Sequence, residues 1–117
     1  MKVVSMVVNV NSSQPEKLMA FYENVVGLEK EPNSGGLKAG KDSLFIVDGH
    51  SDVNGPTENP ARVLVNFFVE KIEPEHERLE AAGVPCIRKL ESEPWGGVFS
   101  TFVDPDGNYF QIVEFRP

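Results

Sequence analysis

Few side chains in this sequence have the types and the spacing that acid–base or metal chemistry requires. The clearest group is Asp48 and His50, which follow an apolar stretch and are separated by one glycine. On a continuing strand the two side chains would point to the same side, where they could form an acid–base pair or half of a metal site. Gly49 and the polar segment after it favour a solvated loop instead.

The other reactive side chains stand alone. Cys86 is the single cysteine, so neither an intrachain disulfide nor a cysteine cluster can form. Pro85 and Ile87 beside it favour a strand, and with no histidine close in sequence the thiol is expected to be buried and inert. His76 recurs with apolar residues at helical spacing and is expected to pack partly under a helix. The sequence therefore predicts no catalytic residue.

The elements that carry these residues form two similar halves. The helix of the first half has a capping-box start, Ser13-x-x-Glu16, and a stop at Gly27. The predicted elements are, in chain order, a strand at about 2–10, a helix at about 15–26, short strands ending at 43–47, a strand at 62–69, a helix from near Pro74 to Gly83, and strands at about 86–90, 98–103 and 109–115.

Matched segments indicate an internal repeat. They are Val10 with Val69, Pro15-Glu16 with Pro74-Glu75, Gly35-Gly36-Leu37 with Gly96-Gly97-Val98, and Leu44-Phe45-Ile46-Val47-Asp48 with Phe110-Gln111-Ile112-Val113-Glu114. Because the order is kept, the prediction is an α+β protein of two tandem βαβββ modules, at about 1–48 and 61–117, joined by a linker at about 49–60. We expect one domain over 1–117, a cup-shaped mixed sheet with the helices on its convex side.

Strand alternation gives the predicted sheet two different faces. The face expected under the helices is apolar and comprises Met6, Val8, Val10, Leu44, Ile46, Val65, Phe67, Val69, Phe110 and Ile112. The opposite, cup-facing set comprises Ser5, Val7, Asn9, Phe45, Val47, Leu64, Asn66, Phe68, Tyr109, Gln111 and Val113. Its mixture of amide, hydroxyl, aromatic and aliphatic groups is typical of a ligand cavity.

Trp95 adds a large ring to this candidate cavity. It lies on a bend between Pro94 and Gly96-Gly97, where it could cap a pocket and stack on a planar or cationic ligand. Packing across a dimer interface or against the last hairpin is the alternative, and both could hold. The predicted ligand-binding residues are Ser5, Asn9, Phe45, Leu64, Asn66, Phe68, Trp95, Tyr109 and Gln111.

The segment Asp104-Pro105-Asp106-Gly107-Asn108 predicts a tight turn, and the apolar strands on either side of it make a hairpin. Together with the repeat, Phe21-Tyr22, Gly27-Leu28, Leu79-Glu80-Ala81-Ala82-Gly83-Val84 and Pro94-Trp95-Gly96, this turn resembles the vicinal oxygen chelate superfamily, the group of glyoxalases, bleomycin resistance proteins and extradiol dioxygenases. The resemblance covers essentially the whole chain. It implies paired modules, a cup-shaped site and, for many short members, a homodimer.

The resemblance also implies where metal ligands would stand. In metal-dependent members they lie in the first and last strands of each module, and the corresponding positions here are Ser5, Phe45, Leu64 and Gln111. Of these only Gln111 could coordinate a divalent ion directly, whereas such an ion needs about three protein ligands. We therefore expect no metal and no other cofactor. A one-residue shift of register would bring in Asp48 or Glu114.

The function expected from the resemblance is metal-independent binding of a small organic molecule, as in bleomycin resistance proteins, which sequester a planar cationic antibiotic. A divergent lyase, isomerase or dioxygenase of the same superfamily is the alternative, with displaced metal ligands or with Tyr109, Asp48 or His50 in a metal-free site. A third possibility is an interaction domain whose own side chains fill the cup.

Charge and hydropathy limit the partners. A formal net charge of −7 argues against binding nucleic acid or an anionic membrane, but it is compatible with a cationic small ligand. The apolar start of the chain has the short, β-branched character of a strand, and no apolar run is long enough to cross a bilayer. We expect a cytoplasmic protein.

Overall fold

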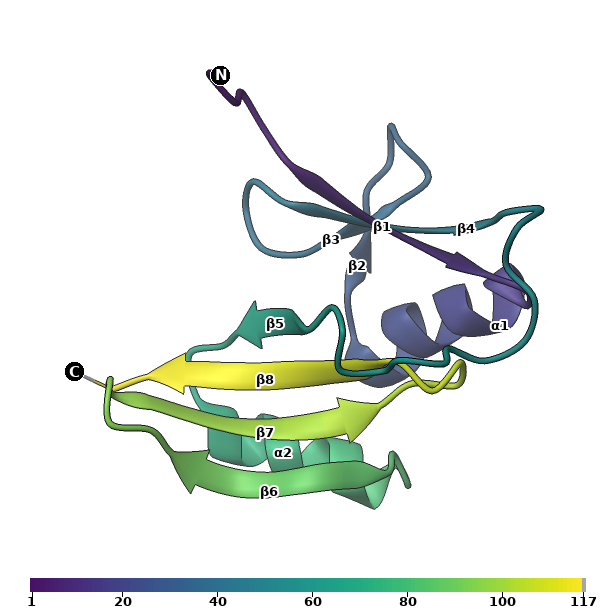
Figure 1. The fold of residues 1–117 in the computed structure, drawn as a ribbon. Coiled ribbons are helices and arrows are strands. Elements are labelled where there is room, and N and C mark those ends of the chain that lie inside the picture. Colours follow the sequence, from purple (N-terminus) through teal and green to yellow (C-terminus); the bar gives the residue numbers. More distant parts are fainter. Residues whose placement is uncertain (117) are drawn as a thin grey trace. The chain divides into compact units, whose positions relative to one another are not determined.

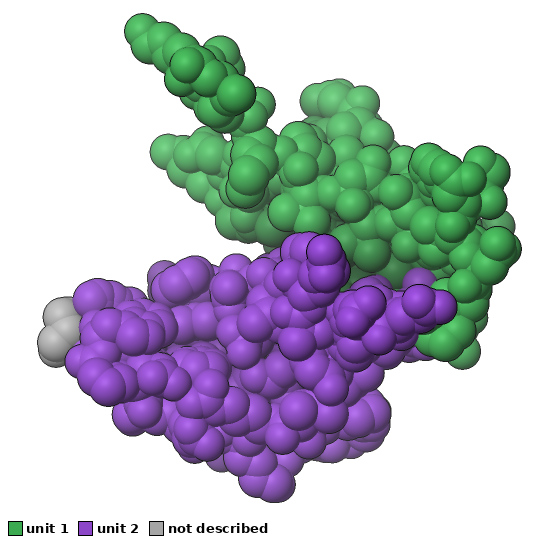
Figure 2. Space-filling view, in the orientation of Figure 1, with its two compact units in different colours: residues 1–56 green, residues 57–117 purple. Residues whose placement is uncertain are grey.

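The computed structural model describes residues 1–116 and divides the chain into two compact units, residues 1–56 and residues 57–117 (Figures 1 and 2). The division falls inside the segment expected to link two modules. Among the described residues, no helix is long and apolar enough to span a bilayer. Whether the units make up one domain stays a prediction, and each unit is described by itself.

Unit 1 has the order strand, helix and three strands. Its elements are β1 (Val7–Ser12), α1 (Pro15–Ala20), η1 (Phe21–Val26), β2 (Glu29–Lys30), β3 (Leu37–Lys38) and β4 (Leu44–Gly49). The strands form a mixed sheet in the order β1-β4-β3-β2, in which β1 and β4 are parallel and the other pairs antiparallel (Figure 1). This is the βαβββ module predicted for the first half.

The predicted helix at 15–26 is confirmed, although its second half has π-helical hydrogen bonding. Pro15 opens it, where a missing N–H costs nothing, and Gly27 ends it with a φ of 95° that other residues rarely adopt. The predicted capping box is wrong. The N-cap residue of the helix is Gln14, and its side chain forms no capping hydrogen bond. The hydroxyl of Ser13 accepts a hydrogen bond from the backbone N–H of Gly55 at 3.1 Å instead of capping the helix.

Unit 2 repeats the same order. Its elements are β5 (Val65–Phe68), α2 (Ile72–Ala81), β6 (Cys86–Ser92), β7 (Gly97–Val103) and β8 (Tyr109–Phe115). The sheet order is β5-β8-β7-β6, with β5 parallel to β8 and antiparallel pairs elsewhere, and α2 covers one face of it (Figure 1). The α+β fold of two tandem βαβββ modules is therefore confirmed.

Aromatic rings form the core between α2 and its sheet. Phe102 and Phe110 are fully buried on neighbouring strands with stacked rings 5.9 Å apart, and Phe67 meets Phe110 edge to face. All three come from strand positions whose alternation turns them toward α2, as predicted for Phe67 and Phe110. The opposite face of the sheet is thus free to carry different chemistry.

The start of α2 is held by a side chain from the sheet. Glu114 accepts a hydrogen bond from the backbone N–H of Ile72 at 2.9 Å and also pairs with the guanidinium of Arg116, which reaches Glu73 as well. A carboxylate satisfies an N–H at a helix N-terminus and complements the helix dipole. These bonds, led by the one from Arg116, lower the pKa of Glu114 to about 2.

The predicted turn and hairpin are confirmed between β7 and β8. The carboxylate of Asp104 is buried and accepts hydrogen bonds from the backbone N–H groups of Asp106 and Asn108 and from the side-chain amide of Asn108, each at 2.9 Å. Gly107 takes a φ of 83° and donates its N–H to the carbonyl of Asp104. The turn fixes the register of β8, pairing Tyr109 with Val103.

The alternation predicted for β4 is wrong by one residue. Phe45 was expected on the face away from the helix, yet it is buried against Tyr22, with ring centroids 4.5 Å apart. It pairs with Val8 across the parallel strands, and both side chains lie on the helix side. Leu44 and Ile46, expected under the helix, therefore lie on the opposite face.

The error arose from the alignment of the repeat. In unit 1 Val8 pairs with Phe45, and the matching residue of unit 2, Phe67, pairs with Ile112. Phe45 therefore corresponds to Ile112 rather than to the residue before it. When the alignment of a strand is shifted by one residue, every side chain in it is assigned to the wrong face of the sheet.

Candidate functional site

A hollow of about 260 Å³ lies on the face of the unit 2 sheet that α2 does not cover. It is lined by Asn66, Phe68, Glu93, Trp95, Phe99, Gln111 and Val113. Strand alternation explains this set: β5, β7 and β8 each turn every second residue to this face. The hollow combines aromatic walls with a few polar groups, as small-molecule sites do.

A row of polar side chains runs across the sheet, and two of its members, Asn66 and Gln111, line the hollow. The hydroxyl of Thr101 donates to Oε1 of Gln111 at 2.8 Å, and Nε2 of Gln111 donates to Oδ1 of Asn66 at 2.6 Å. The row runs across β7, β8 and β5, because Thr101 pairs with Gln111 and Gln111 with Asn66. These bonds orient the amide of Gln111 and leave the amide nitrogen of Asn66 as a donor for a ligand.

Trp95 forms one wall of the hollow on the bend before β7. Its side chain is 55% exposed and meets the ring of Phe115 edge to face, with centroids 6.2 Å apart. The indole lies over Gly97, where a Cβ would overlap Cη2, Cζ2 and Cζ3 of the ring. Glycine at this position is therefore what allows the ring to lie against the strand.

Charged side chains stand at one end of the hollow. The guanidinium of Arg88 lies 4.0 Å from the ring centroid of Phe99 and binds the carboxylate of Glu93 at 2.7 Å as well as that of Glu91. Both carboxylates raise the pKa of Arg88, which keeps it charged. One cation between two anions leaves a net negative charge at this end.

The structure brings together four of the predicted ligand-binding residues, namely Asn66, Phe68, Trp95 and Gln111. Tyr109 shares their face of β8 by alternation but does not line the hollow. Leu64 is exposed and lies just before β5, which is shorter than the predicted strand.

The other predicted site residues belong to unit 1. Asn9 is exposed on β1, Ser5 is exposed ahead of that strand, and Phe45 is buried under the helix, which excludes it from the open face. Asp48 and His50 do not form an acid–base pair. His50 is exposed, and its Nδ1 accepts a hydrogen bond from the backbone N–H of Asp52 at 3.1 Å, so the loop interpretation is confirmed.

Several residues at the hollow were missed from the sequence. Phe99 is buried in it, while Glu93 and Arg88 provide its charges. Val113 is buried in it as well; it was predicted on this face of the sheet but not as a ligand-binding residue. Extending the alternation to the strand at 98–103 would have found Phe99 and Thr101. Alternation could not have predicted the position of Glu93, because this residue lies outside the strands, just before the bend that carries Trp95.

Comparison with known proteins identifies the family. A family model described as Glyoxalase/Bleomycin resistance protein/Dioxygenase superfamily matches residues 4–112. The chain belongs to this superfamily. Two curated relatives, each described as "Putative glyoxylase CFP32", come from Mycobacterium bovis and Mycobacterium tuberculosis and are 29% identical over 91% of this chain. The match covers 42% of either relative, so this chain spans less than half of their length.

Solved structures of the glyoxalase superfamily share the fold. A putative glyoxalase family protein from Bacillus anthracis superposes with a TM-score of 0.74 at 22% identity, covering 99% of this chain and 97% of the other. TnmS3, an antibiotic binding protein from Streptomyces sp. CB03234, superposes with a TM-score of 0.72 at 22% identity, covering 97% of each chain. At this identity the likeness shows the fold alone.

The described residues do not fit the metal site that some glyoxalase superfamily members carry. With the corrected register the counterpart of Gln111 in unit 1 is Leu44, which cannot coordinate, and Leu64 has no donor atom either. At the hollow the amides of Gln111 and Asn66 bind each other. Glu114, considered as a displaced ligand, faces α2 and binds Ile72 and Arg116. Neutral amides are poor ligands for a catalytic divalent ion, which favours His and carboxylate donors.

Proposed function

We propose that this glyoxalase superfamily protein binds a small planar organic molecule in the hollow of unit 2, without a metal ion and without converting it. The observation that supports this most directly is the Thr101–Gln111–Asn66 row. Two of its members, Asn66 and Gln111, lie on the first and last strands of the module, which carry the metal ligands in metal-dependent members, and their amides form hydrogen bonds instead. An amide row offers donors and acceptors at fixed positions.

The walls of the hollow favour a flat ligand. Trp95 and Phe68 are large, apolar and 55% and 66% exposed, so water covers much of the surface of both rings. A flat ligand would remove that apolar surface from water. Stacking on the indole would bury both surfaces and add about 0.5–1.5 kcal/mol beyond the burial of area. The net negative charge around Arg88, Glu91 and Glu93 is compatible with a cationic group on the ligand.

The groups that line the hollow support the proposal of binding without conversion. Among the described residues that line the hollow Glu93 is the one acid or base, and the guanidinium of Arg88 binds its carboxylate at 2.7 Å. Tyr109, considered as a catalytic group for a metal-free enzyme, lies outside the lining. TnmS3, which shares the fold, is an antibiotic binding protein, and this supports the same class of function, binding rather than catalysis, for this chain.

The single tryptophan provides the test. Proflavine, a planar cation, should quench the fluorescence of Trp95 and saturate at one molecule per hollow. Anthracene-2-sulfonate, a planar anion, should quench it less. Gln111→Leu should weaken binding about tenfold through the loss of about 1–1.5 kcal/mol of hydrogen bonding. Tyr109→Phe is the matched control and should bind as the wild type does.

Two results would contradict the proposal. The first is recovery of a chemically altered compound by mass spectrometry after incubation with the protein, which would establish an enzyme. The second is an unchanged affinity in Gln111→Leu together with unchanged Trp95 fluorescence on binding, which would place the ligand elsewhere.

The proposal includes a partner, a second copy of the chain. Val63 and Phe68 are strongly exposed at and beside β5, which is an edge strand of the unit 2 sheet. Exposed apolar residues on an edge strand are a common basis for association. Light scattering after size exclusion should give twice the chain mass, and Phe68→Lys should reduce it; a monomer at all concentrations would refute this part. The cytoplasmic location stays a prediction.

A further inference from the structure

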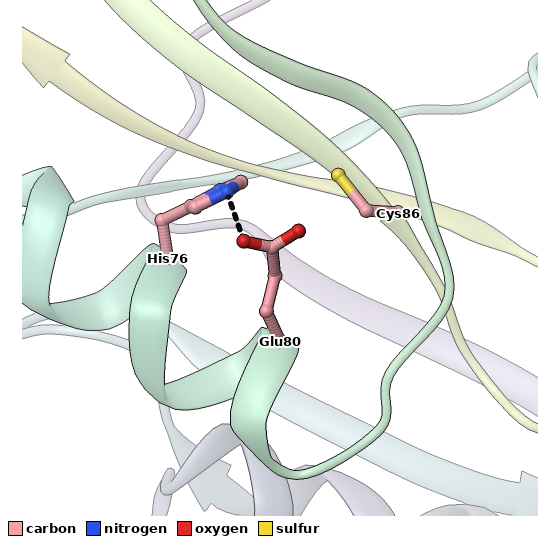
Figure 3. A group of neighbouring side chains, drawn as sticks. All are labelled: His76, Glu80 and Cys86. Carbon is pink, nitrogen blue, oxygen red and sulfur yellow. Dashed lines mark ion pairs between the residues drawn. The ribbon is translucent and has the colours of Figure 1, made fainter.

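We propose that His76, Glu80 and Cys86 form a binding site for a thiophilic divalent cation, of which Zn²⁺ is the model, on the helix side of the unit 2 sheet (Figure 3). This site is separate from the hollow, which lies on the other face of the sheet. It uses none of the positions at which the superfamily resemblance placed metal ligands.

The three side chains converge from two elements. His76 and Glu80 lie one turn apart on α2, and Cys86 is the first residue of β6; Figure 3 shows all three pointing toward one another. Their donor atoms lie within 4.8 Å of one another, and Nε2 of His76 is 2.9 Å from Oε1 of Glu80. Bond lengths to zinc are about 2.0–2.3 Å, so tetrahedral ligand atoms stand roughly 3.3–3.8 Å apart. Small side-chain rotations would bring the donors to that spacing.

The outer contacts that usually support metal ligands are already present. The hydroxyl of Ser100 lies 2.9 Å from Nδ1 of His76 and can accept its N–H, which would leave the lone pair of Nε2 toward the cation. Nζ of Lys89 binds Oε2 of Glu80 at 3.1 Å, which leaves Oε1 as a single ligand atom. Hydrogen-bonded ligand histidines and carboxylates are typical of metal sites.

The donors match the charge and the character of the cation. A neutral imidazole, a carboxylate and a thiolate together carry two negative charges, which a divalent ion neutralises. The sulfur favours zinc and similar ions over Mg²⁺ and Ca²⁺, which prefer oxygen ligands. Three protein ligands would leave the fourth tetrahedral position for water.

The site is partly buried, and solvent reaches it through the side chain of Glu80. His76 is 5% exposed, the side chain of Glu80 is 37% exposed, and Cys86 is half-buried. Burial and the Glu80 carboxylate raise the pKa of the Cys86 thiol, so this cysteine is a poor nucleophile on its own. The thiol donates to the carbonyl of Arg88 at 3.3 Å, and the cation would replace that proton.

Spectroscopy with Co²⁺ tests the site on the whole chain. Titration of metal-free protein should produce an intense near-ultraviolet charge-transfer band from cobalt–thiolate bonding and visible bands of tetrahedral cobalt, and Zn²⁺ should abolish both. Cys86→Ser should lose the charge-transfer band. Ser100→Ala should weaken binding about 10–100-fold, the usual cost of losing an outer contact. Glu77→Gln, on the exposed side of α2, is the matched control and should bind normally.

A measurement on the wild type avoids any dependence on a variant that folds poorly. Stoichiometric Zn²⁺ should slow alkylation of Cys86 by iodoacetamide at least tenfold, and a chelator should restore the original rate. The proposal is overturned by equal alkylation rates with and without Zn²⁺. It is also overturned by a cobalt spectrum that is the same in Cys86→Ser, which would indicate an adventitious ion only. Neither result bears on the hollow, because proflavine binding is measured independently.

Discussion

The indole ring of Trp95 lies over the α-carbon of Gly97, in the space that any other residue would fill with its Cβ. Gly97 is the first residue of β7 and pairs with Phe115, whose ring contacts Trp95 edge to face. One glycine thus determines where the wall of the hollow stands.

Gly97→Ala should move Trp95 out of the hollow, because the added methyl group would overlap the ring. We expect loss of the contact with Phe115, a red-shifted emission from a more exposed indole, stronger acrylamide quenching and weaker proflavine binding. Gly49→Ala is the control, since its Cβ would lie 3.7 Å from Cγ of Pro15, an ordinary contact. Unchanged emission in Gly97→Ala would show that the ring does not rest on the glycine.

Asn66 and Gln111 should be energetically coupled. The hydrogen bond between their amides is exposed, so a double-mutant cycle of Asn66→Ala and Gln111→Ala should give a coupling of only about 0.5–1 kcal/mol in urea unfolding. A cycle that closes to zero would mean that the amides do not bind each other in solution. Ligand affinity measured in the same four proteins should show a larger coupling than stability does.

Stability should fall at low pH through Glu114. The pKa of this carboxyl is lowered from 4.5 to about 2, first by Arg116 and then by the N–H of Ile72. A carboxyl with a depressed pKa stabilises the folded state above the unfolded-state value, and that stabilisation is lost as the pH falls through the folded value. Between pH 4.5 and 2 the free energy of unfolding should therefore decline.

The variant Glu114→Gln isolates this contribution. It should be less stable than the wild type at pH 7, and the difference should shrink toward pH 2 because the wild type then carries a neutral group as well. Glu77→Gln, on the exposed side of α2, should keep the wild-type pH dependence. Parallel pH profiles for the wild type and Glu114→Gln would contradict the assignment.

Asp104→Ala should destabilise unit 2 by about 1.5–3 kcal/mol, because it removes a buried carboxylate that accepts from two backbone N–H groups and one side-chain amide. Asp104→Asn should cost less, since its amide oxygen can still accept from the backbone. Urea unfolding followed by circular dichroism measures both. A loss of under about 0.5 kcal/mol in Asp104→Ala, the range of an ordinary surface change, would refute this role.

The sequence allowed most of the fold to be predicted because its signals were local. Pro15 and Gly27 bounded a helix, the Asp104 turn set a hairpin, and the repeat gave the order of elements twice. In unit 2 the turn also fixed the register, so Gln111 and Asn66 were placed on the correct face.

The site in unit 1 was less predictable for a physical reason. The segment leading into β4 was not predicted as a defined turn, so the register of β4 rested on the repeat alignment. An error of one residue in that alignment placed Phe45 on the open face, whereas it is buried. The cluster of His76, Glu80 and Cys86 joins a helix to the strand after it. Sequence spacing gave His76 its place under the helix but not the approach of the thiol.

The turn at Asp104 also bears on the order in which the chain folds. It closes β7 on β8 within a few residues, while the parallel pairing of β8 with β5 must bring together segments separated by α2 and two strands. Short loops close faster and at lower entropic cost than long ones. We expect the hairpin to be largely formed in the transition state for folding and β5 to dock afterwards. Asp104→Ala should then slow refolding, whereas Asn66→Ala should chiefly speed unfolding.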